Sequence, residues 1–229
     1  MRLFMDWMSG HSLQALLAVS AVFTFLWLLH FRKRLQLGMV AALVLSLLHV
    51  LIGVFCVSIF ARIEGLGDPS ATGNMSLFGG VFFMPIVYWV GAKLTKRSAA
   101  DVFDVFTICL VFTLMCARFS CIITGCCQGA KIPFAGLEAL RWPTREAEIV
   151  FYILLLLILG RKVVGGKTKG KMYPVYMISY GIFRFITETF RESNSSKSII
   201  HIAHLWALIA LCIGISIYVE LSRPRKVRH

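Results

Sequence analysis

The sequence predicts an all-α integral membrane protein, a bundle of about seven transmembrane helices. Of its 229 residues, 58% are hydrophobic and only 15% are charged, which is more apolar surface than a soluble domain of this length buries. Apolar runs of about 17 to 23 residues recur along the chain, and a helix of that length crosses the hydrocarbon core of a bilayer. The alternating pattern of a membrane barrel strand is absent, so helices are the expected elements.

Seven apolar segments are the expected membrane spans: 14–31, 38–60, 77–94, 104–124, 147–163, 173–190 and 203–220. The first lacks a small-residue cleavage site and is followed by a basic cluster, so we expect it to stay in the mature protein. The glycine-rich stretch 165–170 is interpreted as a flexible cytoplasmic linker. With no internal repeat and no soluble segment, residues 1–229 are expected to form a single membrane domain.

The distribution of charge predicts the orientation of the bundle. A formal net charge of +13 suggests nucleic acid or an anionic membrane surface as a partner. The basic clusters lie in alternate connections, at 32–34, 93–97, 161–171 and 223–228. The other connections hold fewer basic residues and most of the loop acids: 61–76, 125–146 and 191–202. Because positively charged loops stay in the cytoplasm, the N-terminus should be outside and the C-terminus cytoplasmic, and no nucleic acid partner is expected.

The sixth expected span carries the most ionisable groups, and such groups inside a membrane are functional candidates unless they are paired. Tyr180, Arg184 and Glu188 lie one helical turn apart, and Arg191 returns to the same face as Arg184. The alternative is an internal Arg184–Glu188 ion pair that holds the bundle together, with Arg191 reaching the interface. We favour a functional role for Arg184 and leave Glu188 open between catalyst and orienting partner.

A second group of candidates lies at the outer end of the fourth span. Arg118 is about two turns before Gly125, which places a guanidinium inside the membrane or at its edge. A guanidinium binds phosphate oxygens through two parallel hydrogen bonds and keeps its charge, so Arg118 and Arg184 could hold one phospholipid headgroup. Gly125 and Gly129 would let the backbone turn or approach a ligand, although glycines also serve helix packing.

Three cysteines, Cys121, Cys126 and Cys127, follow Arg118, and three interpretations remain open for them. Metal binding is disfavoured because separated cysteine pairs and a fourth soft ligand are missing, so no metal or other cofactor is expected. Thiol redox chemistry would suit an oxidising outer face, and a thiolate near Arg118 would be more reactive. The third interpretation is a weakly polar pocket wall.

Two weaker candidates open the third and seventh spans. Gly79 and Gly80 permit close helix contact or expose amides that favour anions. His201 and His204 lie near one face of the seventh span. Either histidine could accept a proton near neutral pH, and simple hydrogen bonding is the alternative.

These blocks, in this order, resemble the prolipoprotein diacylglyceryl transferases. Residues 180–191 fit the YGxxRFxxExxR block of that family at every defined position. Arg118 with Gly125 and Gly129 fits the arginine and later glycines of its GRxGNFxNGExxG signature, and Gly79-Gly80 fits its HGG element. The sequence resembles the family over nearly the whole chain, and the motifs themselves are confined to these short blocks.

The chain also departs from the family pattern. Phe78 stands in place of the family histidine, Cys121 in place of an asparagine and Cys126 in place of a glutamate. Pro143, Thr144 and Glu148 resemble a remnant of the HPSQLYE element, whose histidine and tyrosine are replaced by Trp142 and Ala147. The resemblance is therefore to a divergent member whose general base is not evident.

The resemblance implies a multi-pass enzyme of the bacterial cytoplasmic (inner) membrane. It would move diacylglycerol from the anionic lipid phosphatidylglycerol to the cysteine thiol of a prolipoprotein signal peptide, or to a related acceptor. Arg118 and Arg184 would stabilise the departing phosphate, and Glu188 or His204 would replace the missing base. The implied substrate-binding residues are Tyr180, Gly79, Gly80, Cys121, Gly125, Cys126, Gly129 and Arg191. The alternatives are a non-catalytic lipid-binding or membrane-assembly protein on the same scaffold, and an outward-facing thiol-redox protein.

Overall fold

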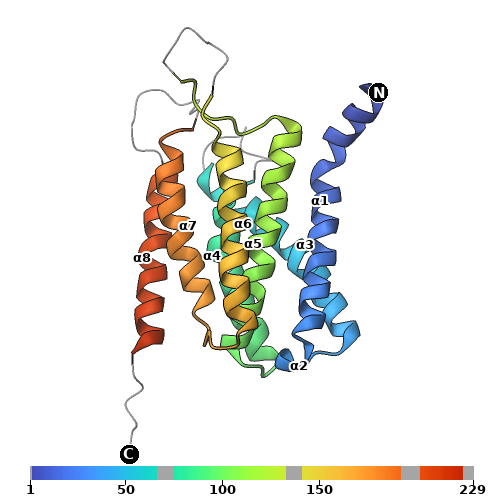
Figure 1. Cartoon of the computed structure of the whole chain (residues 1–229), viewed down its shortest axis with the longest axis vertical. Coiled ribbons are helices and arrows are strands. Elements are labelled where there is room, and N and C mark those ends of the chain that lie inside the picture. The colour runs from blue at the N-terminus through green and yellow to red at the C-terminus, as the bar shows by residue number, and fades with distance from the viewer. Residues whose placement is uncertain (1, 66–74, 133–140, 192–201, 224–229) are drawn as a thin grey trace, which may run out of the picture.

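The computed structural model describes residues 2–65, 75–132, 141–191 and 202–223, and within these ranges the chain consists of helices joined by turns and short loops (Figure 1). Its helices are α1 (Arg2–His30), α2 (Arg32–Leu35), α3 (Met39–Glu64), α4 (Phe78–Leu94), α5 (Ala99–Thr124), α6 (Thr144–Val164), α7 (Met172–Glu188) and α8 (Ile202–Ser222). Each of the seven predicted spans falls on one long helix. His201 and the basic residues beyond Arg223 lie outside the described residues.

The outer surface of the bundle is apolar, as expected for a membrane protein. Four helices are long and apolar enough to cross a bilayer, namely α1 from Gly10 onward, α3, α5 and α8, and α4 is a shorter apolar helix. Large side chains such as Leu51 and Phe55 on α3 are about two-thirds exposed, at 66% and 65%. Exposure of an apolar surface of this extent is unfavourable in water, whereas contact with lipid tails stabilises it.

Helix α5 is the centre of the bundle. In its most apolar stretch 67% of the residues are buried, against 22–33% in α1, α3 and α8. It packs against α1, α4, α6 and α7, and α8 is held mainly by α7. Figure 1 shows α1 at one edge of the bundle and α8 at the other, with the start of α1 and the end of α8 at opposite ends of the bundle. Side chains of α5 can therefore face every part of the interior.

The end of α7 differs from the prediction. The expected span reached residue 190, with Arg191 on the same helix face, but α7 ends at Glu188. Residues 189–190 form a turn, and the backbones of Gly129 and Arg191 then form an isolated antiparallel bridge. In addition, the N–H of Ala130 donates to the carbonyl of Phe190 at 2.8 Å. The backbone after α7 thus exchanges helical hydrogen bonds for pairing with the segment after α5.

The glycine-rich linker before α7 is held in place by one buried carboxylate, contrary to the expectation of a flexible stretch. Asp104, on α5, is fully buried and accepts hydrogen bonds from the Thr168 hydroxyl and from the backbone N–H groups of Gly170 (2.9 Å) and Met172 (3.2 Å). Arg34 reaches the same carboxylate at 3.3 Å and Asp101 at 2.5 Å. We call Arg34, Asp101, Asp104 and Thr168 the Asp104 cluster.

Candidate functional site

Three arginines and two glutamates form a continuous ion network between α5, α6 and α7. Glu148, on α6, forms ion pairs with Arg118 of α5 and with Arg184 of α7, the latter at 2.9 Å. Arg184 also pairs with Glu188 at 2.8 Å, and Arg191 lies 3.8 Å from Glu188. We call these five residues the arginine network. Its formal charges, three positive and two negative, sum to +1.

The arginine network is buried, so its charges depend on one another. Arg118 and Arg184 are each only 6% exposed and Glu148 only 3%. Charges removed from water are tolerated when each is paired, and removing one partner leaves an uncompensated charge. The Arg184–Glu188 ion pair, which was the alternative to a functional role for Arg184, is present, and the site adds Glu148 between the two arginines. Sequence reasoning missed this role of Glu148, and the only signal for it was its place in the HPSQLYE remnant.

Aromatic rings surround Arg184 on the side of α4. The guanidinium carbon of Arg184 lies 5.8 Å from the centroid of the Phe78 ring, within cation–π range. Phe78 and Tyr180 meet edge to face at 5.7 Å. The buried Tyr180 hydroxyl has no hydrogen-bond partner among the described residues, so it does not orient the arginines directly. The Phe78 ring therefore supports the arginine, and the Tyr180 ring packs against Phe78.

A cavity of about 670 Å³ lies beside the network, between α1, α3, α4 and α5. Arg118 and Gly80 line it, and so do the three cysteines. The remainder is largely apolar, with Leu17, Leu110 and Leu114 among its lining residues. A cavity of this size and character accommodates an apolar ligand with a polar end.

A series of hydrogen-bonded polar side chains lies along the same cavity. Ser20 and Thr113 share a hydrogen bond of 2.6 Å between α1 and α5. The His49 ring lies 3.3 Å from the Thr113 hydroxyl and 3.3 Å from the Tyr88 hydroxyl. His49 and Thr113 line the cavity, so its interior contains polar groups that are already bonded to protein.

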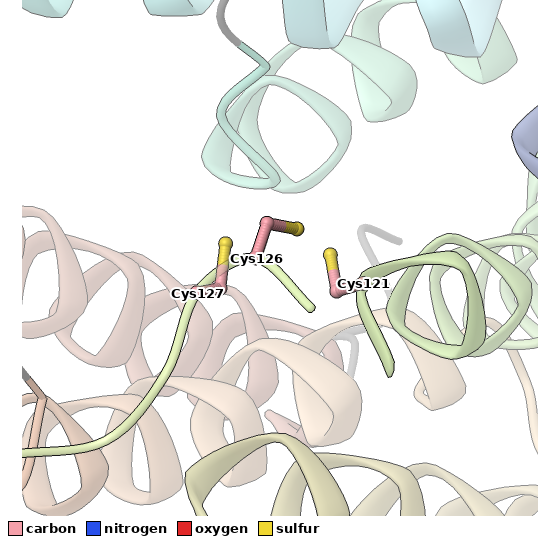
Figure 2. Close-up of side chains that lie close together, drawn as sticks. All are labelled: Cys121, Cys126 and Cys127. Carbon is pink, nitrogen blue, oxygen red and sulfur yellow. The ribbon is translucent and has the colours of Figure 1, made fainter. Parts of the chain in front are cut away.

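The three cysteines line this cavity, and their side chains lie close together (Figure 2). The sulfur atoms of Cys121, Cys126 and Cys127 all lie within 4.8 Å of one another, and all three cysteines are free thiols. Cys121 is on the last turn of α5, and the chain then reverses through Gly125 and Cys127, both with left-handed backbones (φ +71° and +55°). Glycine adopts this conformation at no steric cost, which explains Gly125.

The side chain of Arg145, on α6, holds the reversing turn in place. A guanidinium nitrogen of Arg145 donates to the carbonyls of Cys121 (3.3 Å) and Cys126 (3.4 Å). A hydrogen bond from Cys121, together with the charges of Arg191 and Arg118, lowers the pKa of the Cys127 thiol, and partial burial opposes this. The turn therefore presents a readily ionised thiol next to the arginine network.

The remaining predicted residues have other positions. A Cβ atom on Gly79 would overlap the backbone of Cys56, and one on Gly129 would overlap the carbonyl of Trp142, so both glycines permit close backbone packing. His204 is buried on α8 and meets the Phe185 ring edge to face at 5.1 Å. It is not among the residues that line the cavity. Glu188, the other candidate base, is engaged with two arginines.

Fold and site together define a helical membrane protein with a buried cationic centre beside an apolar cavity. The family model of the prolipoprotein diacylglyceryl transferases matches residues 15–220, and the chain belongs to this family. The predicted family resemblance is confirmed by this match.

Curated relatives carry the name phosphatidylglycerol–prolipoprotein diacylglyceryl transferase. The protein of Mannheimia succiniciproducens is 30% identical over 131 residues, covering 54% of this chain and 49% of the relative. That of Clostridium tetani is 22% identical over 162 residues, 66% of this chain and 65% of the relative. The Chlorobaculum tepidum protein is 26% identical over 163 residues, which cover 66% of this chain and 56% of the relative. The chain thus matches about half to two-thirds of the length of these relatives.

Proposed function

We propose that this protein transfers the diacylglyceryl group of phosphatidylglycerol to the thiol of a lipobox cysteine in a prolipoprotein signal peptide, or to a related thiol. The observation that carries the proposal is the arginine network with its net charge of +1, which meets the apolar cavity at Arg118. A phosphodiester carries one negative charge and would bring the sum to zero. The acyl chains would occupy the apolar part of the cavity.

The reaction requires stabilisation of a phosphate leaving group. In the transfer, the acceptor sulfur bonds to the C3 carbon of the diacylglycerol while the bond from that carbon to the phosphate oxygen breaks. The electron pair stays on the oxygen of the released glycerol phosphate. Arg118 and Arg184 would neutralise this developing charge, and Glu148 and Glu188 would hold the guanidiniums in position.

The membrane arrangement that fits this reaction has seven crossings, with the N-terminus outside and the C-terminus in the cytoplasm of a bacterial inner membrane. Support comes from the basic connections, which alternate along the sequence, and from the start of α1 and the end of α8, which lie at opposite ends of the bundle (Figure 1). The arginine network would then lie in the outer half of the membrane, where exported precursors present their cysteine. Reporter fusions after α1, α3 and α8 test this orientation.

A direct test incubates purified protein in nanodiscs with phosphatidylglycerol and a lipobox peptide, with product detected by mass spectrometry. The expected result is a peptide whose mass increases by one diacylglyceryl group, with phosphatidylcholine inactive as donor. Arg118→Gln should lower the rate by roughly 100-fold or more, the scale of losing one preorganised donor to a developing anion. Arg62→Gln, at an exposed arginine at the end of α3, is the matched control and should retain activity.

A non-catalytic lipid-binding role is the second candidate, favoured by the apolar Phe78 ring against Arg184, where the related transferases have a histidine. The same assay separates the two functions. Phosphatidylglycerol that copurifies and depends on Arg118, without any modified peptide or thiol product, would replace the transferase proposal by lipid binding.

A further inference from the structure

We propose that Cys121, Cys126 and Cys127 bind one zinc ion whose fourth position accepts the thiol of the acceptor. This inference rests on the proposed transfer reaction and assigns the group that activates the acceptor. Three protein ligands with one open position is the arrangement of catalytic zinc sites, and thiolate is a preferred zinc ligand. The sequence spacing disfavoured a metal, whereas the folded turn brings the three sulfurs together.

The geometry of the cluster fits one ion. Zinc–sulfur bonds of about 2.3 Å in a tetrahedron separate the sulfurs by about 3.8 Å. The sulfurs here lie within 4.8 Å, so closure on an ion requires side-chain shifts of about 1 Å or less. Cys126 and Cys127 are exposed, so their rotamers are free to adjust, while Cys121 is anchored on α5. The hydrogen bonds of Arg145 to the carbonyls of Cys121 and Cys126 hold the turn in the required shape.

The surrounding charge also fits. Zinc with three thiolates has a net charge of −1, and the guanidiniums of Arg118 and Arg145 lie next to the three cysteines. Arg118 lines the same cavity as the three cysteines. The metal group and the lipid phosphate would therefore both lie next to Arg118, which places the acceptor sulfur beside the bond that must break.

The zinc ion supplies a function that the ionisable groups of the cavity do not otherwise offer. His49 is bonded to Thr113 and Tyr88, and both glutamates of the network are paired with arginines. A thiol that coordinates zinc loses its proton, here to water at the cavity mouth. The bound sulfur then forms a bond to C3 of the diacylglycerol as the C3–oxygen bond breaks, and the electron pair leaves with glycerol phosphate. The thioether product is a neutral, weak ligand and dissociates, and zinc keeps its oxidation state.

The binding test uses the full-length protein in nanodiscs, stripped with a chelator and kept reduced with a phosphine. Titration with Co²⁺, followed by displacement with Zn²⁺, should show one site per chain with thiolate-to-cobalt charge-transfer absorption. Cys121→Ser, Cys126→Ser and Cys127→Ser should each weaken binding by more than about 100-fold, beyond the loss caused by outer-shell changes. Cys212→Ser, at an exposed cysteine on α8, is the matched control and should bind like the unaltered protein. Equal binding by the triple serine variant would overturn the site.

A second measurement avoids the risk that a variant fails to fold. Zinc should protect the three clustered thiols of the unaltered protein from alkylation, as mapped by mass spectrometry, while the chelator-stripped protein should be alkylated at the same three cysteines. Unprotected thiols at saturating zinc, or binding of Cu⁺ alone, would contradict a zinc site.

Transfer assays on stripped and zinc-reloaded protein distinguish this inference from the proposed function. Loss of transfer on stripping, by about 10-fold or more, with recovery on reloading supports both. Full transfer by the stripped protein overturns the role of zinc and leaves the proposed function intact. Stoichiometric zinc binding without transfer from phosphatidylglycerol in either form overturns both the proposed function and this activating role, although the metal site itself would stand.

Discussion

Helix α5 carries a buried charged residue near each end, and the two have different surroundings. Asp104 accepts hydrogen bonds from two backbone N–H groups, from Thr168 and from Arg34, all of which belong to the protein. Arg118 belongs to the arginine network, whose five formal charges sum to +1, and it lines a cavity. Burial alone therefore does not identify a functional ion pair, because a structural cluster satisfies its own charges while a binding site retains charge for its ligand.

Removing the central carboxylate of the arginine network should have the largest effect on stability. Glu148→Ala leaves the buried guanidiniums of Arg118 and Arg184 with Glu188 as the one remaining carboxylate of the arginine network, so the free energy of unfolding should fall by about 3–5 kcal/mol. Denaturation in mixed micelles measures the change. Glu220→Ala, at an exposed glutamate paired with Arg223, is the control and should change stability by less than about 1 kcal/mol. Equal losses in the two variants would contradict a mutually dependent network.

Neutralising the carboxylate at the other end of α5 should separate stability from activity. Asp104→Asn removes a charge that accepts from Arg34, so we expect a loss of about 1.5–3 kcal/mol in the free energy of unfolding. Transfer per folded molecule should stay within about twofold of the unaltered protein, because the Asp104 cluster serves only to hold the linker. If Asp104→Asn lost transfer activity without losing stability, Asp104 would take part in the reaction. The two ends of α5 would then no longer differ in function.

A smaller effect should follow from removing one neutral donor of the Asp104 cluster. Thr168→Val keeps the volume of a buried side chain but deletes its hydroxyl, so the free energy of unfolding should fall by about 1 kcal/mol. Increased hydrogen exchange should be confined to the linker and the start of α7. Thr95→Val, at an exposed threonine that bonds within its own helix, is the control and should cost a few tenths of a kcal/mol at most.

The smallest predicted effect concerns the alkylation rate of Cys127, which should change little with pH. Because the pKa of Cys127 is lowered, its thiolate should persist as the pH falls from 8 to 6 in the metal-free protein, and alkylation of Cys127 should slow by less than about twofold. Arg191→Gln removes one of the charges that favour the thiolate, so its rate should fall more steeply toward pH 6. Site-resolved mass spectrometry gives both rates. A tenfold decrease in the unaltered protein would show an ordinary thiol.

Features that depend on one segment at a time could be predicted from the sequence. The apolar runs located each long helix, and the one-turn spacing placed Arg184 and Glu188 on one helix face, where their ion pair was the alternative to a functional role. The family blocks predicted membership in the transferase family. The helix through Arg191 was the exception, because pairing of Arg191 with Gly129 depends on a segment about 60 residues earlier in the chain.

Features that depend on contacts between helices were decided only by the tertiary structure. Glu148 lies on α6, yet its role depends on the arginines of α5 and α7 with which it forms ion pairs. The three cysteines lack the spacing of a metal motif, and two left-handed residues of the turn bring their sulfurs together. The sequence by itself determined a helical membrane protein with charges that need partners. Which charges meet, and which one remains for a ligand, follows from helix packing, because side-chain distances across a bundle are not encoded in the periodicity of any single helix.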